Sequence, residues 1–491
     1  MSSNLSPSNN ANDSVFRTLD WLTVGLYLLL VVLGAISIYA ASYDFDHASI
    51  FSFAEFSGKQ FRWIGLALVI GLVILLSDYR IYETYAYPFY IFMLLLLAVT
   101  IFIAPDTKGS HSWLKFGPMS LQPAEFAKCA TALCLAKLIS SYGFKLTSPP
   151  SNFFKAVGII IAPIILIILQ KETGSALVFL ALFFVLYREG MSGLILLAAL
   201  AAVVIFVVAV KYTEPMGLGM AKGQFIVSVL TMLTATLMAG IHARSFEVMR
   251  NLFLGFGDLI GLAFGLNALG LHLPWFWIFV GVIILSAVYM TLNGLRNHLP
   301  KLYVCAIFAV GAIAFSFSVN VLFDHLQPHQ QNRILVSFGI KADPRGAGYN
   351  VNQSMIAIGS GGIQGKGFLN GTQTKLKYVP EQHTDFIFCT IGEEKGFIGT
   401  TSVILLFLIL ILRIIHIAER QPATFSRVYA YCVASYFIFH LCINVGMVIG
   451  LCPVIGIPLP FFSYGGSSLW GFTILLFILL RLDSARKRIR H

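Results

Sequence analysis

The stretch Trp21–Ala41 reads WLTVGLYLLLVVLGAISIYAA and contains no charged side chain. A helix needs about 20 residues to cross the roughly 30 Å hydrocarbon core of a bilayer, so this run is long enough to span it. It is too long for a signal peptide, and no small-residue cleavage site follows it. Comparable apolar runs recur along the chain, which is 57% hydrophobic and only 11% charged. Because soluble domains carry about 25% charged residues, the sequence predicts an all-α polytopic integral membrane protein.

The apolar runs predict about fourteen transmembrane helices, with the N-terminus in the cytoplasm. They are expected near residues 21–41, 61–77, 86–103, 123–139, 153–169, 174–187, 192–210, 224–240, 252–270, 274–293, 302–323, 386–413, 427–449 and 466–481. About twelve spans is the alternative, because the run 252–270 is rich in glycine and contains Asp258. If that run does not cross, one neighbouring run must also fail to cross.

The net charge of +11 is not read as a nucleic-acid signal. Much of the basic excess lies in the short loops that this topology places inside, which is the pattern of the positive-inside rule. The seven cysteines lie mostly in apolar runs without a CxxC pair or a framework spacing. The sequence therefore predicts neither disulfides nor a cysteine metal site.

One connection differs from the others, the stretch of about 60 polar and glycine-rich residues between Asp324 and Asp385. Loops longer than about 15 residues are usually functional or disordered. The topology places this large loop outside the cell, yet it is rich in cations. These are Arg333, Lys341, Arg345, Lys366, Lys375 and Lys377. A basic excess on the outer side breaks the charge rule, so an anionic ligand at the outer membrane surface is the simplest explanation.

The end of this loop, Val379–Phe386, places Asp385 at the mouth of a predicted helix. Thr384 or Asp385 could simply be an N-cap that accepts orphan backbone N–H bonds. Asp385 could instead be a general base that takes a proton from a sugar hydroxyl. His383 is either a second base or an ordinary surface residue. Glu393 and Glu394 lie deeper, where a carboxylate needs a partner, so one of them is expected to pair with a buried cation.

Two further segments carry unusual chemistry. Glu125 and Lys128 are three residues apart on a predicted helix, so they share a face and can form an ion pair, which could also be purely structural. Trp113, just upstream, could be an interfacial anchor. The segment Pro453–Ser468 combines three prolines with paired glycines in an apolar context, which excludes a straight helix. Such backbone at membrane depth indicates a cavity wall, and an irregular external turn is the alternative.

The chain resembles the SEDS family (shape, elongation, division and sporulation). The resemblance rests on Gln122–Lys128 (QPAEFAK), Glu381–Phe386 (EQHTDF) and Pro458–Ser468 (PLPFFSYGGSS), in this order. Gln382 and the run Gly348–Gly362 are more similar to the RodA branch of elongation than to the FtsW branch of division. The resemblance implies a peptidoglycan glycosyltransferase of the bacterial inner membrane that polymerises lipid II. It also implies work with a class B penicillin-binding protein and other membrane proteins of the elongation complex, and no nucleic-acid partner.

By this resemblance, Asp385 corresponds to the essential outer-loop aspartate of the family, and Glu125 with Lys128 to its helix pair. The substrate-binding residues expected on this basis and from the charge of the loop are Trp113, Glu125, Lys128, Arg333, Lys366, Lys375, Lys377, Glu381, His383 and Ser463. Three positions depart from the family pattern. Ser112 stands where an arginine is usual, Ala124 where a serine is usual, and Lys171-Glu172 where Pro-Asp is usual. The missing arginine leaves one phosphate-binding cation unaccounted for, and Lys115 or Lys108 could replace it.

The resemblance also divides the chain. The expected parts are a cytoplasmic tail (1–20), N-terminal SEDS helices (21–210), an extra helical insertion (211–301), C-terminal SEDS helices (302–481, including the outer loop 324–385) and a basic cytoplasmic tail (482–491). The insertion exceeds the helix plan usual in the family, and docking a partner is one possible role for it.

In lipid II the sugar is α-linked to undecaprenyl pyrophosphate, whereas the polymer is β-linked. Inversion indicates a direct displacement without a covalent sugar–enzyme intermediate. The hypothesis assigns Asp385 as the base for the acceptor hydroxyl and the loop cations as the stabilisers of the leaving pyrophosphate. Mg²⁺ or Mn²⁺ could assist through the phosphates, with no organic cofactor. The competing hypotheses are a lipid II flippase, with a polar path lined by Glu125, Lys128, Glu393 and Glu394, and a scaffold for the penicillin-binding protein.

Overall fold

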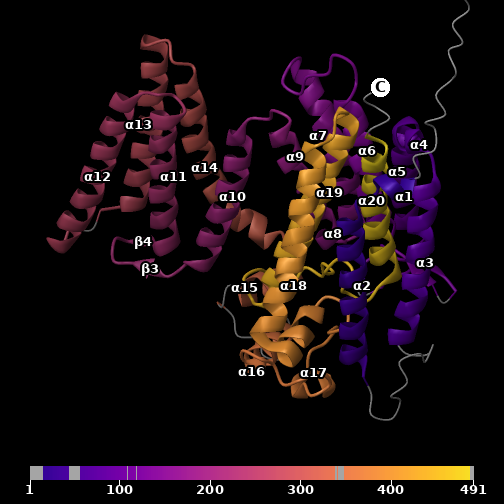
Figure 1. Ribbon diagram of the computed structural model, residues 1–491. Coiled ribbons are helices and arrows are strands. Elements are labelled where there is room, and N and C mark those ends of the chain that lie inside the picture. Colours follow the sequence, from indigo (N-terminus) through magenta and orange to yellow (C-terminus); the bar gives the residue numbers. More distant parts are fainter. Residues whose placement is uncertain are drawn as a thin grey trace, which may run out of the picture. The chain divides into compact units, whose positions relative to one another are not determined.

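The computed structural model describes residues 15–43, 56–107, 109–117, 119–271, 273–337, 340 and 348–486 (Figure 1). Its regular structure is almost entirely α-helical, with two short hairpins. The chain divides into two compact units, which we describe separately. Unit 1 comprises Met1–Met191 with Pro344–His491, and unit 2 comprises Ser192–Asp343.

Unit 1 is built from both ends of the chain. Its helices and strands are α1 (Val15–Thr18), α2 (Trp21–Ser42), α3 (Phe56–Leu76), α4 (Tyr79–Thr84), α5 (Ala86–Ile103), β1 (Leu114–Phe116), β2 (Met119–Leu121), α6 (Pro123–Ile139), α7 (Pro150–Leu169), α8 (Thr173–Phe179), α9 (Leu182–Arg188), α16 (Tyr349–Gly361), α17 (Thr372–Lys375), α18 (Ile387–Glu419), α19 (Thr424–Val448) and α20 (Gly466–Ser484). Strands β1 and β2 pair as an antiparallel hairpin directly before α6.

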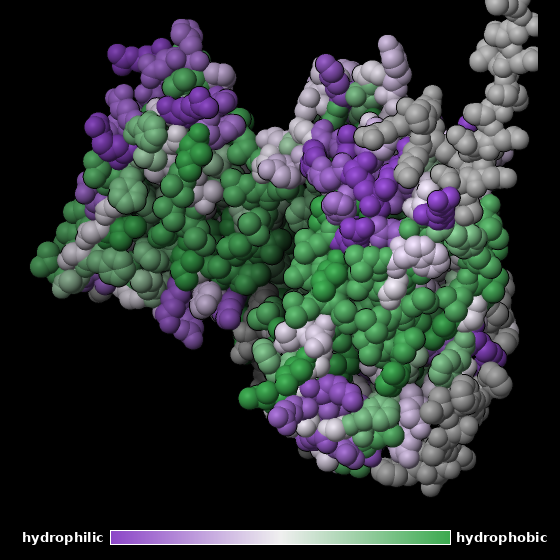
Figure 2. Space-filling model, in the orientation of Figure 1, coloured by the Kyte–Doolittle hydropathy of each residue, from purple (hydrophilic) through white to green (hydrophobic). Residues whose placement is uncertain are grey.

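The core of unit 1 consists of α6, α19 and α20, which pack on one another. Every residue of α20 from Leu475 to Ser484 is buried, and α6 is buried along nearly its whole length. The outer helices α3 and α5 instead expose leucine and valine side chains, which suits contact with lipid. In Figure 2 this unit shows a hydrophobic band between two hydrophilic ends. The central helices can therefore carry polar side chains that would be costly at the lipid face.

Close backbone approaches shape the outer-loop end of unit 1. A Cβ atom on Gly361 of α16 would lie 2.0 Å from the carbonyl oxygen of Gly392 in α18, so these two helices cross in near contact. Gly396 has φ of 62° and interrupts α18, so that Ile387–Lys395 forms a separate helical segment. Gly34 of α2 meets the backbone of Phe461 in the same way. Glycine is the residue that permits both the positive φ and these approaches.

Unit 2 consists of α10 (Gly193–Lys211), β3 (Pro215–Met216), β4 (Met220–Ala221), α11 (Lys222–Ile241), α12 (Phe246–Ala268), α13 (Trp275–Arg296), α14 (Lys301–Asp324) and α15 (Pro328–Ser337). Helix α11 contacts α10, α12, α13 and α14, and Met232, Ala235 and Phe279 are almost completely buried in the core. Unit 2 spans more residues than the predicted insertion 211–301, because it also includes α10 and α14, which pack with α11. The insertion itself stays a prediction.

Each predicted helix coincides with a helical segment, and the all-α membrane fold is confirmed. In the described part of the chain, twelve helices are long and apolar enough to cross a membrane, which is the number of the alternative count. The reason given for that alternative is wrong, because α12, which covers the run 252–270, is one of the twelve. The two other predicted spans, 123–139 and 174–187, are shorter as continuous helices than these twelve. Helix α6 has 17 residues and carries Glu125 and Lys128, and the predicted helix 174–187 is divided into α8 and α9. The outer loop is not structureless, since it contains α15, α16 and α17.

Candidate functional site

Asp385 lies in the turn Glu381–Phe386 that leads into α18, with its side chain partly exposed. The N-cap position of α18 is Phe386, so the N-cap interpretation of Thr384 or Asp385 is wrong. The carboxylate lies against the irregular segment between α19 and α20, because a Cβ atom on Gly456 would be 3.4 Å from its Oδ2. Gly456 has φ of 77°. The predicted base Asp385, in the motif Glu381–Phe386, therefore lies beside Gly456 of the segment Pro453–Ser468.

Aromatic rings surround the same turn. The His383 ring stacks on Phe56, with centroids 4.2 Å apart, and meets the edge of Tyr464. The backbone N–H of Tyr464 donates to the carbonyl of His383 at 2.8 Å. Burial raises the pKa of the Tyr464 phenol above its ordinary value, so this hydroxyl stays protonated. His383 is thus packed into the wall of the site.

Ser463 and Gln382 stabilise this wall of the site through buried hydrogen bonds. Ser463 is buried, and its Oγ accepts a hydrogen bond from the backbone N–H of Leu459 at 2.8 Å. Gln382 is also buried and donates from Nε2 to the carbonyls of Ala41 and Thr374. The irregular segment is therefore packed in protein, which agrees with the cavity-wall interpretation of Pro453–Ser468.

Glu125 and Lys128 form the predicted ion pair, with 2.9 Å between Oε2 and Nζ. Their residues are only 3% and 2% exposed, so the pair belongs to the core. Lys128 Nζ also lies 3.1 Å from His440 Nε2 of α19 and 4.5 Å from the centroid of the Phe472 ring. This environment favours the structural interpretation of the pair, and its role in substrate binding stays a prediction.

Sequence reasoning missed His440, which connects this pair to the irregular segment. Its Nδ1 lies 3.0 Å from the carbonyl oxygen of Pro458, which can only accept, so Nδ1 carries the proton. Nε2 is then the acceptor for the Lys128 ammonium, and the ring is neutral. The available signal was a polar residue in an apolar run, which by itself does not name a partner 312 residues away.

Glu393 of α18 organises the part of the outer loop next to the site. Its carboxylate accepts from Lys366 Nζ at 2.8 Å and from the backbone N–H groups of Gln373 and Thr374 at 2.9 Å. The expected pairing of one deep glutamate with a cation is confirmed, but the cation is not buried as predicted, since the Lys366 side chain is 27% exposed. Glu394 accepts from the backbone N–H of Leu369. Lys366 is thus engaged in holding the loop.

The remaining predicted cations have different surroundings. Lys375 Nζ lies 5.6 Å from the centroid of the Tyr43 ring, and Lys377 follows it at a backbone position with φ of 55°. Arg333 lies in α15 of unit 2, and its side chain is outside the described residues, as are Lys108, Lys341 and Arg345. Lys375 and Lys377 belong to the same unit as Asp385, as do Lys128 and Lys366, and their role in substrate binding stays a prediction.

Trp113 is half-buried and directly precedes β1. The preceding Ser112 is fully buried, and its Oγ donates to Glu172 Oε2 at 2.9 Å, as does Ser110 Oγ at 2.7 Å. Two departures from the family pattern, Ser112 and Glu172, are thus in direct contact. Ser112 occupies a buried position bonded to a carboxylate, whereas Lys115 is exposed, and its role as the replacement cation stays a prediction.

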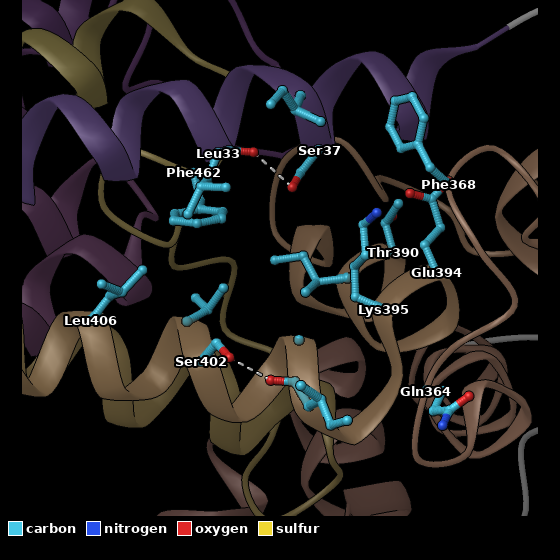
Figure 3. A pocket seen from close by; sticks show the side chains of 15 residues that line it. Leu33, Ser37, Gln364, Phe368, Thr390, Glu394, Lys395, Ser402, Leu406 and Phe462 are labelled. Carbon is cyan, nitrogen blue, oxygen red and sulfur yellow. Dashed lines mark hydrogen bonds between the residues drawn. The ribbon is translucent and has the colours of Figure 1, made fainter.

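A cavity of about 530 Å³ lies between α2 and α18 (Figure 3). Thr390, Glu394 and Lys395 gather at one end, and Leu33, Leu406 and Phe462 line the other. Its shape and lining suit an amphipathic ligand with an apolar tail and a polar end. Asp385 precedes the same helix but does not line this cavity.

The described residues do not bring three or more His, Cys, Asp or Glu side chains together in a group that could hold a metal ion. Mg²⁺ commonly binds through one or two carboxylates together with substrate phosphates and water, so it does not require such a group. The metal requirement stays a prediction.

The sequence matches the family of cell cycle proteins that comprises FtsW, RodA and SpoVE over residues 20–271 and 278–488. The chain belongs to this family. Among its relatives is the peptidoglycan glycosyltransferase RodA of Treponema pallidum, 29% identical over 467 residues that cover 95% of this chain and 97% of the relative. The peptidoglycan glycosyltransferase MrdB of Escherichia coli is 28% identical over 491 residues, which cover 98% and 99% of the two chains.

Solved structures share the fold. A chain from a structure of a peptidoglycan synthase complex aligns with a TM-score of 0.60 at 21% identity, covering 95% of this chain and 98% of that chain. The rod shape determining protein RodA of Thermus thermophilus aligns with a TM-score of 0.53 at 21% identity, covering 95% and 97%. The SEDS resemblance noted from the motifs is thus confirmed, as is the multi-pass membrane architecture.

Proposed function

We propose that this protein is a peptidoglycan glycosyltransferase that polymerises lipid II into glycan strands during cell elongation. Family membership and the activity in the names of the Treponema and Escherichia relatives support the reaction class. The observation that carries the proposal is the position of Asp385, which is partly exposed and lies against Gly456 of the irregular segment. The RodA-like motif at Gln382 supports elongation rather than division.

Asp385 has the geometry for a general base. It stands on a turn outside the helix, and the missing side chain at Gly456 leaves the backbone of the irregular segment beside the carboxylate. The carboxylate would take the proton of the acceptor hydroxyl as that oxygen attacks the anomeric carbon of the donor. The bond to undecaprenyl pyrophosphate breaks in the same step, which inverts the configuration.

The leaving pyrophosphate needs positive charge. Lys375 and Lys377 of the outer loop are candidates from the sequence, whereas Lys128 is buried in the core and Lys366 pairs with Glu393. Arg333 stays a candidate from the sequence. When bound, Mg²⁺ or Mn²⁺ would supply further charge neutralisation at the phosphates. The cavity between α2 and α18 is the proposed site for an apolar segment of a polyprenyl tail, since apolar side chains of both helices line it.

The flippase alternative needs a polar path through the bilayer. The predicted lining residues of such a path are Glu125, Lys128, Glu393 and Glu394. All four are buried and hydrogen-bonded to protein partners, and of these Glu394 lines the cavity between α2 and α18. This burial supports the polymerase over the flippase. A scaffold for the penicillin-binding protein would not require Asp385 at all.

The proposed location is the bacterial cytoplasmic membrane, with Asp385 on the outer face. A class B penicillin-binding protein is the proposed partner, together with other membrane proteins of the elongation complex. The solved structure of a peptidoglycan synthase complex, which contains a chain of this fold, supports such an assembly.

The decisive experiment is polymerisation of lipid II by the purified protein with Mg²⁺ or Mn²⁺, with and without a class B partner, with products separated on a gel. Wild type is expected to give polymer, and Asp385→Asn is expected to give none while remaining folded. Asp106→Asn, an exposed aspartate in another loop, is the matched control and should retain activity. Full activity of Asp385→Asn would reject the assignment of the base. Transport of lipid II across vesicles without any polymer would favour the flippase.

A further inference from the structure

Helix α19 carries three buried polar side chains at a spacing of four residues, Tyr436, His440 and Asn444. They are 0%, 1% and 0% exposed. Side chains at this spacing lie one above the other on the same helix face. Each contacts a different segment of the site. Tyr436 donates to the carbonyl of Lys128 at 3.2 Å, and His440 to that of Pro458 at 3.0 Å.

Asn444 joins the turn that carries Asp385 to the irregular segment that contains Ile457. Its Nδ2 donates to the carbonyl oxygen of Asp385 at 2.9 Å and to that of Ile457 at 2.7 Å. The orientation of the amide follows from these partners, since a reversed amide would place Oδ1 against two carbonyl oxygens. Both N–H groups are therefore used to bridge the turn before α18 and the irregular segment.

The bridge lies in the interior of unit 1. Asn444 is 0% exposed and Ile457 is 1% exposed. A buried amide that donates both N–H groups to two carbonyls rigidifies the segments that it joins. The bridge therefore holds the backbone of Asp385 against Ile457, the neighbour of Gly456.

We propose that Asn444 is a positioning residue for the reaction, an inference that rests on the proposed glycosyltransferase function. By holding the Asp385 and Ile457 carbonyls on one amide, Asn444 sets the place of the Asp385 carboxylate relative to the irregular segment. It acts through Asp385 and does not touch the substrate. Because a misplacement of about 1 Å can cost about 100-fold in rate, loss of this bridge should slow the chemical step rather than weaken substrate binding.

The test compares Asn444→Leu, which removes both donors, with Asn444→Ser, which stays polar but is too short to bridge two carbonyls. The control is Asn293→Leu in α13, which removes an amide that donates to the carbonyl of Tyr289 at 2.9 Å in unit 2. For each variant, kcat and KM for lipid II are measured per folded molecule, together with backbone hydrogen exchange of residues 379–388 and 454–462. If Asn444→Leu does not fold, Asn444→Ser gives the answer.

The expected result is a fall in kcat of about 100-fold with little change in KM, and faster exchange in both segments. The acid limb of the pH profile should keep its midpoint, because Asn444 bonds the backbone and not the carboxylate of Asp385. Asn293→Leu should match wild type. A kcat within threefold of wild type for a variant whose exchange has increased would overturn the proposal and leave Asn444 as a structural residue only. If wild type itself makes no polymer, the proposed function fails, and the exchange data alone decide whether Asn444 fixes the two segments.

Discussion

Units 1 and 2 are both bundles of apolar helices, but they differ in what they bury. Unit 1 buries ionisable side chains, among them Glu125, Lys128, Glu393 and His440. In the described part of unit 2, the buried polar side chains are four hydroxyls, those of Ser228, Thr231, Thr236 and Ser286. Ionisable groups inside a membrane protein are expensive and mark functional regions. Hydropathy alone therefore identifies the membrane protein, whereas buried charge distinguishes unit 1, which also contains the candidate base Asp385.

Close glycine approaches occur in both units, but individual helices differ in their use of glycine. In unit 1, Gly34, Gly361 and Gly392 lie where an added Cβ would meet a neighbouring segment within 3 Å. In α12 of unit 2, Gly255, Gly257, Gly261 and Gly265 have no neighbour within 4 Å among the described residues. The first group permits close packing, and no contact in the described structure requires the second. The comparison can be tested by changing matched residues in the two units.

The largest effect is expected from breaking the buried pair. Lys128→Met leaves Glu125 as an uncompensated charge in the core of unit 1, and breaking such a pair typically costs about 3–5 kcal/mol. Lys222→Met, which breaks the exposed pair with Glu214 in unit 2, should leave the thermal unfolding temperature in detergent unchanged. Equal unfolding temperatures for the two variants would contradict the contrast between the units.

The glycine contrast predicts effects of opposite sign. Gly361→Ala forces α16 away from α18, and overpacking of this kind is expected to cost about 3 kcal/mol. Gly257→Ala in α12 is expected to stabilise unit 2 by about 0.5–1 kcal/mol, because alanine is the better helix former and meets no neighbour. Denaturation curves of the two variants would measure both. Destabilisation by Gly257→Ala would show that the open face is packed in the native protein.

A smaller effect depends on pH. Burial would raise the pKa of the Asp20 carboxyl, but hydrogen bonds from Arg413 and Thr23 outweigh it and lower the pKa from 3.8 to about 2. A lowered folded-state pKa contributes stability that is present above the unfolded pKa and is lost as the pH falls through the folded pKa. Unit 1 should therefore lose about 2 kcal/mol between about pH 4 and pH 2.

Asp20→Asn removes this dependence and should be less stable than wild type by a similar amount near neutral pH. Unfolding curves measured over this range of pH test both statements. A wild type and an Asp20→Asn variant with parallel pH dependence would show that the ion pairs of Asp20 with Arg413 and Arg420 do not stabilise the fold.

Much of the fold could be predicted from local sequence. Every apolar run of suitable length became helical, because run length and hydropathy act within one segment. The outer loop was harder, since α16 is short and its packing depends on the Gly361–Gly392 approach to α18. The count of spans differed because α6 has only 17 residues and the run 174–187 is divided into α8 and α9.

The sequence by itself determined that this is a polytopic helical membrane protein of the SEDS type and that Asp385 is its candidate base, because apolar run lengths and contiguous motifs are local properties. Three contacts become visible only in the folded chain: Lys128 pairs with His440 as well as Glu125, Gly456 lies beside Asp385, and Asn444 bridges Asp385 and Ile457. These contacts join residues that are distant in the chain. They depend on how α6, α18 and α19 pack, and that packing is set by side chains of the whole core rather than by any one motif.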